Sequence, residues 1–97
     1  MSKSLYTSEA KEIRALLRQA RQDAGLSQAE LAAEFDRPQS FVSTIERGLV
    51  RADLVQIRAW CLLCGTTLPA FVNALEERLK GGLRSKAASV RRRKPAS

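Results

Sequence analysis

Apolar residues recur at helical spacing along most of the chain, and helices can be assigned from this spacing and from the residues that cap it. The first helix is expected over residues 8–24, where an apolar stripe repeats every three or four positions and Gly25 follows as a stop. The second is expected over 28–35, because Ser27 and Glu30 have the spacing of a capping box. Both segments therefore predict amphipathic helices with one face in a core.

Three more helices follow by the same criteria. The third is expected over 39–47, the fourth begins at Asp53 and ends before Gly65, and the fifth begins near Thr67. Strand-forming residues show no long alternating run, so β structure has little support. The sequence predicts an all-α fold, a compact five-helix bundle.

Charge divides the chain into a nearly neutral body and a basic end. Six of the 17 basic residues, and none of the 10 acidic ones, lie in residues 81–97. We therefore expect an N-terminal arm over 1–7, a helical domain over 8–80 and a flexible basic tail over 81–97. Such a tail suggests a polyanionic partner such as nucleic acid, and the alternative is a solvated end with no partner.

Catalysis finds little support in the residues present. The chain has no histidine, which removes the commonest general base, and it shows no glycine-rich phosphate loop or paired acids. Cys61 and Cys64 form a C-x-x-C, but without histidine or a second such pair they cannot complete a tetrahedral zinc site. We expect a non-enzymatic protein with no catalytic residues, no metal and no cofactor, whose cysteines pack in the core.

The expected location is the cytoplasm. No apolar run of signal-peptide type follows Met1, and no stretch has the length needed to span a bilayer. The sequence therefore predicts no membrane partner and cysteines that stay reduced.

Residues 27–48, SQAELAAEFDRPQSFVSTIERG, hold the most informative pattern. Two short helices flank a tight break, and the second helix carries small polar groups largely opposite its apolar Val42 and Ile45. A helix fits the major groove of DNA, where glutamine can bond adenine bidentately and serine or threonine can bond either kind of base pair. A face meant only for solubility would usually carry Glu and Lys. The residues expected to read bases are Gln39, Ser40, Ser43 and Thr44.

The chain resembles the phage repressor and Cro type of helix-turn-helix protein, the XRE-like regulators. The resemblance covers about residues 8–79 and is carried by IRALLRQARQDAGLSQAELA, by PQSFVSTIERG and more loosely by LVQIRAWCLLCGTTLPAFV. It implies a lambda-repressor-like domain that binds double-stranded DNA, usually as a dimer on a palindromic site. It also implies that Gln28 grips a phosphate and braces the recognition helix, and that Arg47 and Arg51 lie near the DNA backbone.

Two residues depart from the family pattern. Asp36 stands where a glycine is usual in the turn, and Pro38 stands where a serine or threonine usually caps the recognition helix. The first is expected to strain the turn slightly, and the second fixes the backbone where the helix begins. Phe41 has two interpretations, packing on the preceding helix or contact with a thymine methyl or sugar. The polar and basic residues named above have the alternative of being merely solvated.

The sequence thus predicts a DNA-binding transcriptional regulator that acts as a repressor. An alternative is an antitoxin or adaptor whose main partner is another protein, and a nonspecific nucleic-acid binder would rest on the tail alone. A homodimer is expected, because one recognition helix reads only a few base pairs. The apolar residues expected at its contact surface are Leu62, Leu63, Phe71, Leu75 and Leu79. The alternative is that all of them pack inside the chain.

Overall fold

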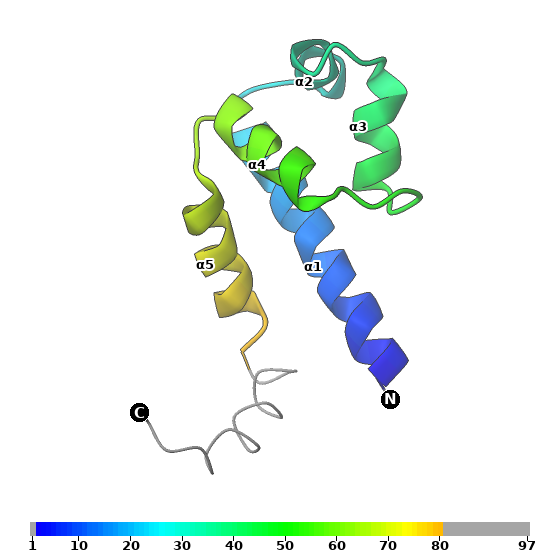
Figure 1. Ribbon diagram of the computed structural model, residues 1–97, viewed down its shortest axis with the longest axis vertical. Helices are drawn as coiled ribbons and strands as arrows, with labels where there is room; N and C mark the ends of the chain where they lie inside the picture. The colour runs from blue at the N-terminus through cyan, green and yellow to red at the C-terminus, as the bar shows by residue number, and fades with distance from the viewer. Residues whose placement is uncertain (1, 81–97) are drawn as a thin grey trace.

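The computed structural model describes residues 2–80, which form five helices and no strand (Figure 1). The expected all-α, five-helix architecture is confirmed for this part of the chain. The predicted basic tail at 81–97 lies outside the described residues. The helices are α1 (Ser2–Asp23), α2 (Gln28–Glu34), α3 (Gln39–Glu46), α4 (Leu54–Leu63) and α5 (Leu68–Arg78).

Three helices begin where side chains satisfy their first backbone N–H groups. Ser27 Oγ accepts the N–H of Glu30 at 3.0 Å, and the Glu30 carboxylate accepts the N–H of Ser27 at 2.8 Å. Asp53 and Gln56 make the same reciprocal pair at 2.8 and 2.9 Å. The hydroxyl of Thr67 accepts a backbone N–H at 3.3 Å. Caps of this kind contribute about 1 kcal/mol each, and the sequence placed the starts of these three helices at or next to the capping residues.

The start of α1 differs from the prediction. The helix begins at Ser2 rather than near Ser8, so it includes residues that the sequence placed in an N-terminal arm. The apolar stripe that indicated the helix starts only at Ile13, whereas residues 2–7 contain no glycine or proline that would end a helix growing toward the N-terminus.

Every helix contributes to one small core around Trp60. This side chain is fully buried, and its Nε1 donates to the carbonyl of Leu17 at 2.9 Å. In Figure 1 the long α1 runs between α5 on one side and α3 on the other, with α2 at the far end. The pair α2–α3 is thereby held at one side of the bundle. The buried apolar residues are Leu17, Leu31, Ala32, Val42, Ile45, Trp60, Cys61 and Phe71.

The apolar surface expected to hold a second copy is largely internal. Phe71 is only 7% exposed and Leu63 packs against the core, so of the expected five only Leu62 is markedly exposed. α5 packs against α1 and α4, so most of these side chains are buried or half-buried within the chain itself. A different group, here called the loop patch, is 54 to 78% exposed: Leu49, Val50, Leu54 and Val55.

Within residues 2–80 no single helix is long and apolar enough to cross a membrane. The consecutive helices α4 and α5 reach the necessary length and composition only as a pair, and they are bent by 107° where they meet.

Candidate nucleic-acid interface

The turn between α2 and α3 sets the position of α3. Asp36 adopts a left-handed backbone, with φ of 58°, which is the conformation that the usual glycine would take without strain. Pro38 occupies the N-cap position in an extended conformation and makes no side-chain cap. Both departures noted in the sequence are therefore accommodated, and the backbone N–H of Arg37 closes the turn on the carbonyl of Ala32 at 3.0 Å.

α3 has one buried and one polar side. Val42 and Ile45 are at most 2% exposed and face the core. Ser40 lies on the opposite side and is exposed, with Ser43 and Thr44 half-buried next to it. The structure thus brings the three predicted hydroxyl residues together on a single strip of this helix.

The hydroxyl groups of Thr44 and Ser43 donate to backbone carbonyls of α3 itself. Thr44 Oγ1 donates to the carbonyl of Ser40 at 2.7 Å and lies 3.3 Å from that of Phe41, while Ser43 Oγ makes a long contact of 3.5 Å to the carbonyl of Ser40. The oxygen lone pairs and the Thr44 methyl remain for a partner. In this arrangement Thr44 can accept from an exocyclic amine of adenine or cytosine, or touch a thymine methyl.

A chain of side-chain amides links the start of α3 to its end. Gln39 Nε2 donates to Gln28 Oε1 at 3.3 Å, and Gln28 Nε2 donates to Glu46 Oε1 at 3.0 Å. Gln28 is the first residue of α2, so it spans both ends of α3 from the neighbouring helix. The resemblance predicted such bracing of the recognition helix by Gln28, and the structure shows the contact.

The carboxylate of Glu46 fixes the direction of the hydrogen bonds that link these amides. An ionised carboxylate only accepts hydrogen bonds, so Gln28 must turn its NH₂ toward Glu46 and its oxygen toward Gln39. Gln39 must then turn its own NH₂ toward Gln28. One N–H and the carbonyl oxygen of Gln39 remain, which is the donor–acceptor pair that adenine requires.

Glu46 is itself held by a residue that the sequence prediction missed. Arg21 of α1 donates to Glu46 from Nε at 2.7 Å and from Nη2 at 3.0 Å, and from Nη1 to the carbonyl of Leu26 at 2.8 Å. The two side chains are 9% and 2% exposed. The hydrogen bond with Glu46 raises the pKa of Arg21 further, against the opposing effect of burial. The missed signal is the position of Arg21, one helical turn after the buried Leu17.

Phe41 packs against Phe35 at the end of α2, with ring centroids 5.0 Å apart. Of the two interpretations of Phe41, packing on the preceding helix is confirmed.

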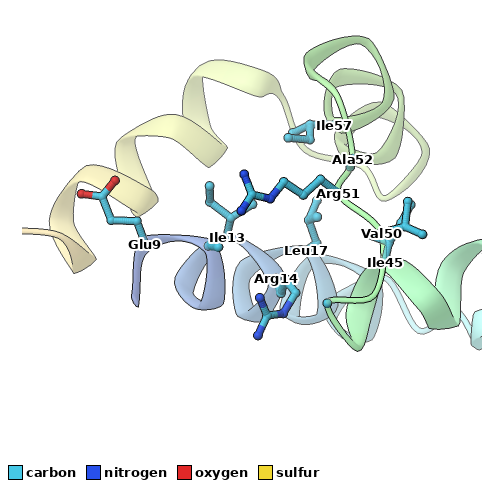
Figure 2. Close-up of a pocket in the computed structure, with 11 residues that line it drawn as sticks. Glu9, Ile13, Arg14, Leu17, Ile45, Val50, Arg51, Ala52 and Ile57 are labelled. Atoms are coloured by element: carbon cyan, nitrogen blue, oxygen red, sulfur yellow. The ribbon is translucent and has the colours of Figure 1, made fainter. Parts of the chain in front are cut away.

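The two arginines expected near the DNA backbone lie differently. Arg47 is the exposed C-cap of α3 and continues its polar strip. Arg51 lies in the α3–α4 loop and extends along a hollow of about 350 Å³ toward Ile13 on α1, rather than along α3 (Figure 2). Arg14 lines the same hollow, near the end of α3. The structure therefore places Arg47 at the end of the polar strip, whereas Arg51 lines both this hollow and a second one beside Ser40 and Thr44.

The two cysteines lie at the end of α4. Cys61 is fully buried in the core, and Cys64 packs against it half-buried. Burial raises the pKa of both thiols, that of Cys64 to about 11. Among residues 2–80 no three His, Cys, Asp or Glu side chains are placed to hold a metal ion.

Comparison with known proteins places this geometry in a family. Residues 12–75 match a family model described as a helix-turn-helix domain. Among solved structures the chain is similar to an XRE-family like protein from Pseudomonas syringae pv. tomato str. DC3000, with 36% sequence identity and a TM-score of 0.74, over 79% of this chain and 94% of that chain. No curated protein matches. With the helix pair, its polar strip and these matches in agreement, the chain belongs to the XRE-like helix-turn-helix family and is a DNA-binding regulator of transcription.

Proposed function

We propose that the protein is a repressor that reads the major groove of an operator with α3. The observation that supports this most strongly is the amide chain from Glu46 through Gln28 to Gln39. It presents an oriented carboxamide at the start of an otherwise small and uncharged strip. A preformed donor–acceptor pair of this kind matches the N7 and N6 edge of adenine.

In this proposal some of the polar and basic side chains contact bases, and others contact phosphates. Gln39, Ser40, Ser43 and Thr44 meet base edges along the groove. Gln28 offers its second amide N–H to a phosphate, because the first is engaged by Glu46. Arg47 and Arg51 contact the sugar–phosphate backbone of the DNA beyond the end of α3. For this contact the side chain of Arg51 must first move away from α1.

We further propose a homodimer on a palindromic site, acting in the cytoplasm. One helix of eight residues covers too few base pairs to select a site in a genome. The loop patch begins three residues after the end of α3. Contact between two copies there would place their recognition helices side by side on one face of the DNA, and exposed apolar patches tend to mark partner surfaces.

The test begins with selection of bound sequences from random duplexes, followed by affinity measurements on the selected site and on random DNA. Gln39→Ala should weaken the selected site by about 1 to 3 kcal/mol and change random DNA far less, because a bidentate base contact is lost. Arg47→Ala is the matched control. It should weaken both duplexes alike, since phosphate contacts carry no sequence information. Equal losses for Gln39→Ala on both duplexes would remove it as a base reader.

A second candidate is an antitoxin or adaptor, and the loop patch is the observation that favours it. An apolar surface this exposed suits another protein as well as a second copy. Sedimentation of the purified chain at micromolar concentration, with and without the selected site, separates the two. Two copies per site would support the dimer, whereas one copy per site at saturation would exclude it and favour a different partner.

A further inference from the structure

A second hollow lies along the flank of α3 that faces away from Gln28. Its volume is about 280 Å³, and it lies between Phe41 and Thr44 of α3 and Gln56 of α4, with the two cations Arg37 and Arg51 also lining it. Phe41 is two residues from Gln39 and therefore about 160° from it around the helix, so the two mark opposite edges of the polar strip. None of the residues that line this hollow is acidic.

Arg37 is held in place by a stack of rings that begins in the core. Its guanidinium carbon lies 4.5 Å from the centroid of the Phe41 ring. Phe41 contacts Phe35 at 5.0 Å between centroids, and Phe35 contacts the buried Trp60 at 6.1 Å. The position of this exposed cation is thereby tied to the centre of the molecule, and its attraction to the face of the ring holds it there.

The stacked guanidinium keeps its donors available. A guanidinium that lies on a ring presents its N–H groups at its edge, where they can bond a phosphate with two parallel hydrogen bonds. Arg37 makes no ion pair within residues 2–80, unlike Arg21 and Arg78. Its charge is therefore not neutralised inside the described part of the molecule.

We propose that Arg37, stacked on Phe41, anchors a DNA phosphodiester on the flank of the recognition helix opposite Gln28. This rests on the proposed reading of the major groove by α3. A helix in that groove, about 12 Å wide, has a sugar–phosphate strand on each side. Gln28 contacts one DNA strand, and Arg37, which lines the hollow, contacts the other. The ligand class is the phosphodiester backbone, so the contact adds affinity without sequence preference.

The experiment measures affinity against salt concentration for the full chain on the selected site and on random duplex DNA. Arg37→Gln should reduce the slope of log affinity against log salt by about 0.9, equivalent to a loss of about 8-fold near 0.1 M salt, on both duplexes. Arg78→Gln is the control. It removes the same charge from α5, on the other side of α1 from α3 (Figure 1), and should leave the slope unchanged. Thermal melting should show both variants folded.

A second pair of variants tests the stacking itself. Phe41→Leu keeps an apolar side chain in the core contact but removes the ring, and should weaken binding about 2- to 5-fold. In the Arg37→Gln background the same change should cost little, because Phe41 then has no cation to hold. Additive losses would show that Phe41 acts independently of Arg37.

The outcomes separate this inference from the proposed function. If the wild-type chain selects no sequence, the proposed function fails. If it selects a site but Arg37→Gln behaves like Arg78→Gln, only the anchor is wrong. A changed preferred sequence in Arg37→Gln would also overturn the phosphate assignment, since it would show that Arg37 reads a base.

Discussion

At the scale of single residues, the buried pair of Arg21 and Glu46 shapes the surface that we propose reads DNA. Glu46 satisfies Arg21 with both of its oxygens and orients Gln28 with one of them. A buried pair of this kind gains little net stability over apolar residues, but losing one partner leaves an uncompensated buried charge. Its use here is geometric, because it fixes which way two glutamine amides point.

Glu46→Gln should therefore cost stability and specificity together. It leaves Arg21 without a charged partner, so the free energy of unfolding in urea should fall by about 3 kcal/mol. Discrimination between the selected site and random DNA should also fall, because an amide at position 46 no longer fixes the orientation of Gln28. Glu12→Gln, which breaks the exposed pair with Arg78, should cost less than about 1 kcal/mol and leave discrimination intact. Equal costs for the two substitutions would contradict the role given to the buried pair.

The thiol of Cys64 should be slow to react at neutral pH. Burial raises its pKa from 9.0 to about 11, so at pH 8 its thiolate fraction is about 100-fold below that of the unfolded chain. Iodoacetamide labelling at Cys64 of the native chain should rise about tenfold per pH unit up to pH 11, whereas labelling in guanidinium should level off above pH 9. The unfolded chain loses this proton first, so stability should fall between pH 9 and 11. Native labelling at pH 8 as fast as in guanidinium would disprove the shift.

At the scale of helices, local signals predicted the boundaries well and long-range contacts poorly. Ser27, Asp53 and Thr67 mark the starts of α2, α4 and α5 because capping is a property of three or four neighbouring residues. The partner of Arg21 is 25 residues away, and no local pattern identifies it. For the same reason the pattern alone could not decide how far the apolar face of α5 packs internally, since burial depends on how the helices pack.

Substituting two glycines that follow helices should distinguish the energetic cost of backbone strain from the cost of a side-chain clash. Gly25 has φ of 73°, and a Cβ added there would have nothing within 4 Å, so Gly25→Ala should cost about 1 kcal/mol from its left-handed backbone alone. Gly48 has φ of 82°, and a Cβ there would lie 2.7 Å from Cζ of Arg14. Gly48→Ala should cost more, because Arg14 must also leave the C-terminal end of α3, where a cation is favourable.

The double variant Gly48→Ala with Arg14→Ala provides the control. Measured against Arg14→Ala, its further cost should fall to that of Gly25→Ala, since no guanidinium remains to be displaced. Chemical unfolding of the wild-type chain and of the four variants gives the free energy of unfolding for each comparison. Equal costs for Gly25→Ala and Gly48→Ala in the wild-type background would show that the contact with Arg14 contributes nothing.

At the scale of the whole molecule, most of the net charge lies in a different part of the sequence from the surface that we propose reads DNA. The net charge is +7, yet the polar strip of α3 from Gln39 to Thr44 carries no charged residue. Uncharged groups discriminate between bases, whereas cations supply affinity that depends on salt. Residues 81–97, which lie beyond the described residues, hold six cations and no acid. We therefore expect specificity and much of the affinity to come from different parts of the chain.

Removal of the basic segment should change affinity but not the preferred sequence. Each phosphate neutralised contributes about 0.9 to the slope of log affinity against log salt, so engagement of half of the six cations would contribute about 3. A chain ending at Lys80 should show a slope smaller by that amount on both the selected site and random DNA. A full-length chain with the six cations replaced by glutamine should match it, which separates charge from length. An unchanged slope would mean that the segment does not contact DNA. An altered preference at A·T-rich flanks would instead indicate an arm in the minor groove, where basic side chains read groove width.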